Sequence, residues 1–438
     1  MYETATVKER ALCVGIERTG IGSSQLSGAF GAGGTVPAWP LEESLAELIR
    51  LVQTAGAECV GTISQRLKEP NSRTFIGKGK VDEVREAVLA LKADIIVFDD
   101  ELTPTQQQNL EHEIKNVKII DRTALILDIF ALHAQSREGR LQVRLAQNRY
   151  LLPRLRGMWE HLASNRMGGG VGSRFGEGES QLEVDRRMVR KRIERIREEL
   201  KKVHSERQTQ RKARQGSGIF MVSLAGYTNA GKSSLLNRLT GADVLAYDAL
   251  FATLDSTTRR LSLPNGREMT ISDTVGFIQK LPTTLIEAFK STLDEITGAD
   301  LILHVVDVTS EHFDAHILAV NEVLEQIGAH KLVQILVFNK IDALNEVELS
   351  ALKGRHPNVV FVSAQQGTGI NELLERIEHA ANATSSLLHV CIPFAQGALV
   401  RLAHEQCSII NEEHNESGTL LQLRVPQALV SKFSDYTI

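Results

Sequence analysis

The run Gly226-Tyr-Thr-Asn-Ala-Gly-Lys-Ser233 constrains this chain more than any other feature of its sequence. It follows a predicted buried strand, Ile219–Ala225, and precedes a helical run. The glycines let backbone N–H groups approach a phosphate without a Cβ clash, and the helix N-terminus adds partial positive charge. In this pattern the lysine reaches the β- and γ-phosphates and the serine hydroxyl ligates Mg²⁺. The expected nucleotide-binding residues are Gly226, Tyr227, Thr228, Asn229, Ala230, Gly231, Lys232, Ser233 and Ser234.

A second segment, Asp273-Thr274-Val275-Gly276, follows a predicted strand at Met269–Ser272. Parallel sheets of this kind bind ligands at the carboxyl ends of their strands, so the segment should lie beside the phosphate loop. Asp273 can hold Mg²⁺ through water, and the Gly276 amide can bond a γ-phosphate oxygen and sense whether that phosphate is present. Taken alone, the segment is equally compatible with an ordinary turn.

Two later segments follow the next strands and favour guanine as the base. Asn339-Lys340-Ile341-Asp342 ends the predicted strand Val333–Phe338. The Asp342 carboxylate can accept hydrogen bonds from guanine N1–H and N2–H₂, whereas adenine has no donors there and would leave the carboxylate without a partner. Ser363-Ala364-Gln365 ends the last predicted strand, and its backbone can meet the guanine O6. Together the ordered segments predict a Mg²⁺-dependent GTPase that binds GTP and GDP.

The predicted elements divide the 438 residues into four parts of an α/β protein. Residues 1–121 form a small α/β unit with parallel strands, after a glycine- and serine-rich stretch near residues 20–34. Residues 122–216 form a helical hairpin around a glycine-rich loop at 157–178; Pro153 should end or kink its first helix, and its second helix should start near Gln181. Residues 217–384 form a doubly wound P-loop GTPase domain, and residues 385–438 a small α+β unit.

Composition excludes several classes of protein. The chain is 42% hydrophobic with a formal charge of -4, which excludes global disorder and a globally basic nucleic-acid binder. No run approaches the roughly 20 apolar residues of a membrane span, and the N-terminus does not resemble a secretory signal. The four cysteines show neither metal-ligand spacing nor a disulfide framework, which fits a reducing cytosol. We expect a cytoplasmic monomer.

The second helix of the hairpin is strongly basic. Asp185–Arg214 contains thirteen Lys or Arg and five Asp or Glu, a local charge of +8 in a chain of -4. A solvated helix face explains most such runs, but the asymmetry also fits a polyanionic partner. Along the same helix, apolar residues recur at coiled-coil spacing. They are Val189, Ile193, Ile196, Leu200 and Val203.

The wider chain resembles the HflX family of bacterial ribosome-associated GTPases over roughly residues 40–380. The matching segments outside the nucleotide site are Phe75–Lys80, Asp121–Phe130, Leu141–Gln147, Tyr150–Leu155 and Gly178–Arg187. The family usually has Arg-Gly-Pro-Gly-Glu where this chain has Arg174-Phe-Gly-Glu-Gly-Glu179, which affects the hairpin loop. The resemblance implies binding to the large ribosomal subunit and its RNA through the N-terminal unit and the basic hairpin. It also implies a role in ribosome splitting, rescue or biogenesis.

The loop that should order around GTP is Phe251-Ala252-Thr253-Leu254-Asp255. From spacing alone, Thr253, Thr257 or Thr258 could ligate Mg²⁺; the resemblance implies Thr253. With Lys232 and Gly276, Thr253 completes the predicted catalytic set. Asn229 suggests that K⁺ is a second cation, because some related GTPases use an Asn here for that purpose. The alternative is that this Asn bonds its own turn.

Phe277 stands where many GTPases have a Gln that orients the attacking water. Phe cannot bond water, so a partner or another loop must complete the site. A nucleotide-gated binding protein with incidental turnover is therefore an alternative function, and an ATPase with a chance Asn339–Asp342 segment is another. Asp99 and Asp100 follow a predicted strand and are expected to form a turn or helix cap. The scattered His133, His161 and His204 do not predict a metal site.

Overall fold

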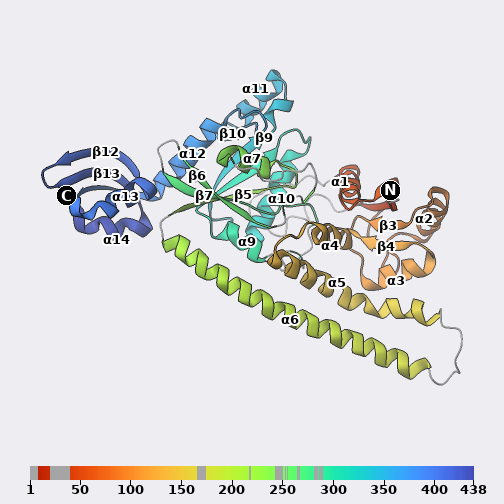
Figure 1. Ribbon diagram of the computed structural model, residues 1–438. Helices are drawn as coiled ribbons and strands as arrows, with labels where there is room; N and C mark the ends of the chain where they lie inside the picture. Colours follow the sequence, from red (N-terminus) through yellow and green to blue (C-terminus); the bar gives the residue numbers. More distant parts are fainter. Residues whose placement is uncertain are drawn as a thin grey trace, which may run out of the picture. The chain divides into compact units, whose positions relative to one another are not determined.

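The computed structural model describes residues 8–19, 40–164, 174–216, 219–241, 250, 251, 253, 255–263, 267–280, 285 and 290–438 (Figure 1). The chain divides into two compact units. The first comprises Met1–Lys201 with Gln279–Phe289, and the second comprises Lys202–Ile278 with Lys290–Ile438. No described helix is long and apolar enough to cross a membrane.

The first unit is built on a parallel sheet with the strand order β2-β1-β3-β4. Helices α2 and α3 pack against one face, where Leu12 and Phe98 lie in the buried core. Helix α1 packs on the other face, where Gly15 leaves room for Leu41 and Leu45. The elements are β1 (Arg10–Arg18), α1 (Leu41–Thr54), β2 (Glu58–Leu67), α2 (Lys78–Leu91), β3 (Ile95–Phe98), α3 (Pro104–Glu113), β4 (Lys118–Asp121) and α4 (Arg122–His133).

The predicted helical hairpin consists of α5 (Arg137–Ser164) and α6 (Arg174–Gly216), which run side by side in Figure 1. Their seam is apolar and joins two residues of each helix, Leu141 and Leu145 to Ile193 and Ile196. The predicted helix limits were wrong, because α5 continues past Pro153 and α6 begins before Gln181. Pro153 is exposed, so water can hydrate the carbonyl that loses its N–H donor.

Residues 157–164 and 174–178 of the predicted loop are therefore helical. Its glycine run, Gly168–Gly170, lies outside the described residues, as does the predicted loop at 20–34. The helical stretch predicted from Arg122 is also interrupted. Ser136 caps the start of α5, since its hydroxyl accepts a hydrogen bond from Gly139 N at 2.8 Å.

The second unit contains the predicted doubly wound sheet, with the strand order β10-β9-β8-β5-β7-β6. All pairs are parallel except β6 with β7. The sequence did not predict β6, because its threonines and arginines resemble an exposed loop. The elements are β5 (Phe220–Gly226), α7 (Lys232–Thr240), β6 (Thr257–Ser262), β7 (Glu268–Asp273), α9 (Lys290–Thr297), β8 (Leu301–Asp307), α10 (Phe313–Gln326), β9 (Val333–Asn339), η1 (Ile341–Ala343), α11 (Glu346–Arg355), β10 (Val360–Phe361) and α12 (Ile370–Ala383).

The C-terminal part of this unit is an antiparallel sheet with the order β11-β13-β12. The predicted hairpin is present, and the Asn415 side chain closes its turn by accepting hydrogen bonds from Ser417 N and Gly418 N. Helices α13 and α14 pack on one face, with Phe433 fully buried. The elements are β11 (Ser385–Ile392), η2 (Phe394–Gln396), α13 (Gly397–Gln406), β12 (Ser408–Asn415), β13 (Gly418–Pro426), η3 (Gln427–Leu429), α14 (Val430–Phe433) and η4 (Ser434–Tyr436).

Candidate functional site

The phosphate loop joins β5 to α7 and has a backbone that only certain residues adopt. Gly231 has φ +86°, and a Cβ there would lie 2.2 Å from Asn339 Nδ2. Asn229 also has positive φ, at 61°, which Asn tolerates better than most residues. The loop therefore depends on Gly231 to let the Asn339 segment approach it closely.

Lys232 lies at the centre of the site and is 6% exposed. Its Nζ donates to the carbonyl oxygens of Gly226 at 3.1 Å and Tyr227 at 2.9 Å. Burial lowers the pKa of Lys232 to about 8, and Asp273 opposes that shift. The ammonium group is thus held by backbone carbonyls at the point where phosphate oxygens would meet it.

Three oxygen-bearing side chains converge at the start of α7. Ser233 Oγ lies 2.8 Å from Thr253 Oγ1 and donates to Asp273 Oδ2 at 2.6 Å. Asp273 is fully buried, and its Oδ1 has no hydrogen-bond partner. Burial raises the pKa of Asp273, although Lys232 and the two hydroxyl groups oppose the shift. Hard oxygen donors with one unsatisfied carboxylate oxygen suit Mg²⁺.

Thr257 and Thr258, the other candidate ligands, lie in β6 and pair with β7. Thr258 Oγ1 is 2.9 Å from Ser272 Oγ. The structure therefore brings the Thr253 hydroxyl to Ser233, whereas the Thr258 hydroxyl bonds Ser272. In the same predicted loop as Thr253, Phe251 is buried and Asp255 is half-buried. The other two residues of this loop, Ala252 and Leu254, lie outside the described residues.

The predicted guanine segments meet the phosphate loop through Asn339, which is 2% exposed. Its Nδ2 donates to Ala230 O at 2.9 Å, and its Oδ1 accepts from Ala364 N at 3.0 Å. Lys340 Nζ lies 2.6 Å from Asp307 Oδ2. One side chain therefore holds three loops together.

The remaining residues of these segments are placed as follows. Ile341 is buried and Asp342 is exposed in η1. Ser363 Oγ accepts from Gln366 N at 3.0 Å, and Arg238 donates to the carbonyl oxygens of Ala364 and Gln365. The exposure of Asp342 places this residue on the solvent side of the loops.

The segment after Asp273 is fixed to the phosphate loop by backbone hydrogen bonds. Thr274 Oγ1 donates to Leu224 O at 2.7 Å, and Val275 is buried. Phe277 N donates to Gly226 O at 3.1 Å, and Thr228 N donates to Phe277 O at 2.7 Å. The Phe277 side chain is 2% exposed, so it is a packing residue.

Sequence reasoning missed His304, which lies in β8 and is 2% exposed. Its Nε2 has no hydrogen-bond partner, and burial, followed by Lys232, lowers its pKa to about 4. Tyr227 stacks on His316 of α10 at 4.1 Å between ring centroids. A histidine inside an otherwise apolar strand was the available signal for His304.

The chain bends at Asp99 and Asp100, as a turn implies, but the hydrogen-bond partners of the Asp99 side chain are charged and polar side chains rather than a helix end. In the first unit this fully buried carboxylate accepts hydrogen bonds from Arg122, Ser44 and Lys280, each at 2.6 Å. Lys280 Nζ also lies 3.0 Å from Asp100. Burial raises the pKa of Asp99, and Lys280 opposes that shift. An ion network explains the two carboxylates better than local turn chemistry, because their partners are distant in sequence.

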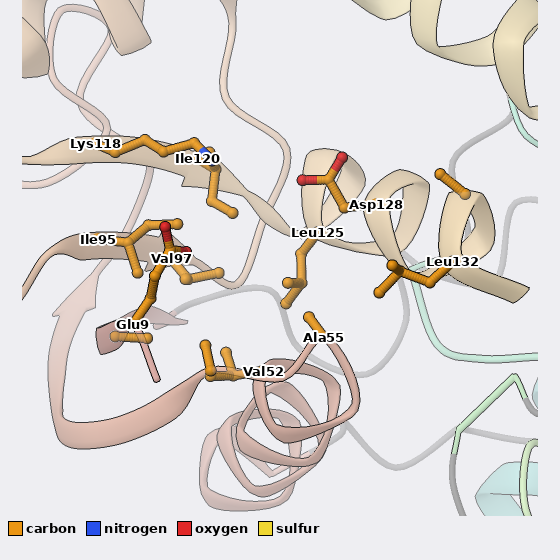
Figure 2. A pocket seen from close by; sticks show the side chains of 13 residues that line it. Glu9, Val52, Ala55, Ile95, Val97, Lys118, Ile120, Leu125, Asp128 and Leu132 are labelled. Carbon is orange, nitrogen blue, oxygen red and sulfur yellow. The ribbon is translucent and has the colours of Figure 1, made fainter. Parts of the chain in front are cut away.

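A cavity of about 270 Å³ lies at the amino ends of β1, β3 and β4 in the first unit (Figure 2). Its wall is mostly apolar and includes Val97 and Leu125, and its polar residues are Glu9, Lys118 and Asp128. α/β sheets bind nucleotides at the opposite ends of their strands, and two carboxylates against one ammonium disfavour phosphate. We therefore do not assign the nucleotide to this cavity. Among the described residues, no group of three or more potential metal ligands of the His, Cys, Asp and Glu types occurs.

Three family models match the chain in succession. The model described as GTP-binding GTPase N-terminal matches residues 42–131, GTP-binding GTPase Middle Region matches 133–214, and 50S ribosome-binding GTPase matches 221–340.

Individual relatives match nearly the whole chain. GTPase HflX of Caldanaerobacter subterraneus subsp. tengcongensis is 46% identical over 397 residues, which are 91% of each chain. GTPase HflX of Escherichia coli K12 is 43% identical over 387 residues, 88% of this chain and 90% of the relative. A crystal structure of SsGBP with GDP is 24% identical, covers 86% of this chain and 99% of its own, and has a TM-score of 0.45.

Proposed function

Since this chain belongs to the HflX family of GTPases, we propose that it couples its hydrolysis of GTP to reversible association with the large ribosomal subunit. The family model over residues 221–340 is described as a 50S ribosome-binding GTPase, and this observation carries the proposal. Its role would be ribosome splitting, rescue or biogenesis, in the cytoplasm and as a monomer. The four parts of the chain, 1–121, 122–216, 217–384 and 385–438, would divide the work between RNA contact and nucleotide binding.

The roles that we propose in the nucleotide site are those predicted from its sequence motifs. Lys232 and the loop backbone hold the phosphates, the Gly276 amide contacts the γ-phosphate, and Asp342 selects guanine. Ser233 and Thr253 would hold Mg²⁺ directly, and Asp273 would hold it through water, which fits their mutual distances of 2.6 and 2.8 Å. When bound, Mg²⁺ supplies positive charge that neutralises the phosphate oxygens.

The basic helix α6 supports RNA as the partner. Its apolar seam faces α5, whereas Arg190, Lys191 and Arg195 are exposed. Among these three, the only salt bridge described joins Arg195 to Glu199 at 3.2 Å, and Arg195 is 81% exposed. An exposed pair of this kind contributes little to stability, so the guanidinium remains available to phosphate.

A charge-reversal variant tests this proposal. We expect Arg190→Glu, Lys191→Glu and Arg195→Glu together to weaken co-sedimentation with large ribosomal subunits and to flatten its salt dependence, since each lost phosphate contact removes about one released counterion. The matched control reverses Lys331, Lys353 and Arg355, which are exposed in the second unit, for the same change in net charge. Equal sedimentation of the two variants at every salt concentration would show that α6 is only a solvated face.

A further inference from the structure

GTP hydrolysis in this protein needs a polar group that Phe277 does not provide. Where other GTPases have Gln, the Phe277 side chain is buried, and its backbone is bonded in both directions to the phosphate loop. Its ring therefore neither reaches nor bonds the attacking water. The group that replaces Gln must come from elsewhere around the γ-phosphate position.

Thr228 is the polar side chain that the fold places there. A Cβ built on Gly276 would lie 2.8 Å from Thr228 Cα, 2.9 Å from Thr228 Cγ2 and 3.0 Å from Lys232 Nζ. Gly276 is the residue whose amide is assigned to the γ-phosphate, and Lys232 is the assigned phosphate cation. Thr228 and the Lys232 ammonium group thus both lie beside Gly276, the residue assigned to the γ-phosphate.

The Thr228 hydroxyl is buried and has no protein partner. The residue is 7% exposed, and its Oγ1 has no hydrogen-bond partner, although its amide donates to Phe277 O at 2.7 Å. Buried hydroxyl groups are nearly always hydrogen-bonded, so an exception requires an explanation. A β-branched side chain also has few rotamers, and Thr228 Cγ2 occupies the space where a side chain at Gly276 would begin.

We propose that the Thr228 hydroxyl is a catalytic group that hydrogen-bonds the attacking water and a γ-phosphate oxygen. A hydroxyl can accept one hydrogen bond while it donates another, which is the combination that a water-orienting Gln supplies. The water oxygen forms a bond to the γ-phosphorus, and the bond from that phosphorus to the β–γ bridging oxygen breaks. The electron pair leaves with GDP, and both protons of the water remain on inorganic phosphate, H₂PO₄⁻. Thr228 changes neither its own bonds nor its protonation.

The test compares two conservative substitutions of Thr228. Thr228→Val keeps the shape and β-branch but removes the hydroxyl, whereas Thr228→Ser keeps the hydroxyl and removes the methyl group. We expect single-turnover GTP hydrolysis to fall about 100-fold in Thr228→Val, the order found when one transition-state hydrogen bond is removed. Thr228→Ser should stay close to the wild type.

Two further readouts separate catalysis from structure. Thr228→Val should bind fluorescent GDP as the wild type does, but should lose the tighter binding of GDP with aluminium fluoride, an analogue of the transition state. Its thermal stability without nucleotide should be equal or higher, because removing an unpartnered buried hydroxyl stabilises or is neutral.

The role of Thr228 rests on the proposed nucleotide site, and the experiment distinguishes a failure of that site from a failure of the hydroxyl's role. If the wild type does not bind GDP, the assignment of the nucleotide site itself is refuted. Hydrolysis at the wild-type rate in Thr228→Val, or an equal loss in Thr228→Ser, would refute the role of the hydroxyl while leaving the site intact.

Discussion

Removal of the Asn339 side chain should separate the three loops of the nucleotide site. The amide makes two buried hydrogen bonds, to Ala230 O at 2.9 Å and from Ala364 N at 3.0 Å. Both partner residues are buried, at 0% and 7% exposure. In Asn339→Ala the carbonyl and the N–H would each lose their partner.

The magnitude follows from these two bonds. A typical hydrogen bond contributes about 1 kcal/mol net to stability, so two contribute about 2 kcal/mol. These bonds join loops that must be ordered around the nucleotide. Without them, the free energy needed to order the loops would be subtracted from the free energy of GDP binding. We expect GDP affinity to fall about 30-fold, since each 1.4 kcal/mol corresponds to a factor of about ten.

The assay is equilibrium titration of fluorescent GDP, with thermal unfolding measured in parallel. The matched control is Asn415→Ala, which also removes an Asn side chain that makes two hydrogen bonds to the backbone, but in the C-terminal hairpin. The control should lose some stability and bind GDP normally. Wild-type GDP affinity in Asn339→Ala would refute the claim that this residue holds the site together.

Three further predictions concern the base, the second cation and acid stability. Asp342→Asn turns an acceptor toward the guanine N–H groups into a donor, so GTP binding should weaken and xanthosine triphosphate be preferred; unchanged GTP affinity would remove the guanine assignment. If Asn229 helps to bind K⁺, hydrolysis should be faster in K⁺ than in Na⁺ at equal ionic strength, and Asn229→Ala should abolish the difference; equal wild-type rates would favour a loop-stabilising Asn. Burial lowers the pKa of His304 from 6.5 to about 4. As the pH falls from 7 toward 4, the unfolded chain therefore binds a proton at this histidine that the folded chain does not, and the free energy of unfolding decreases. His304→Leu should reduce that loss by about 1 kcal/mol between pH 7 and 5.5, measured by thermal unfolding at both values, and an unchanged loss would show that another group is responsible.

Most of the candidate nucleotide site was predictable because four of its segments, all except Phe251–Asp255, follow a parallel strand of one sheet. Parallel strands present their carboxyl ends at one edge, so Asp273 bonds Ser233 and Asn339 bonds Ala230 of the phosphate loop although these residues are far apart in sequence. The resemblance implies Thr253 as the Mg²⁺ ligand, whereas spacing alone leaves Thr257 and Thr258 open, because it does not show that both lie in β6 and pair with β7. Local spacing carries no information about such a pairing.

Other features depend on long-range contacts that no local pattern encodes. Asp99 resembled a strand-end cap, but its partners Ser44, Arg122 and Lys280 come from three separate segments. Pro153 predicted the end or a kink of a helix, and the structure excludes the end: with the apolar seam between α5 and α6 and an exposed proline, α5 continues to Ser164. In both cases tertiary packing outweighs the local preference.

Co-sedimentation with purified large ribosomal subunits tests the central proposal most directly. The full chain would be mixed with subunits in the presence of GDP or a non-hydrolysable GTP analogue, at one fixed salt concentration. More protein should pellet with the GTP analogue than with GDP, because the proposed γ-phosphate contact at Gly276 would distinguish the two states. Equal pelleting in both nucleotides, or none in either, would contradict it.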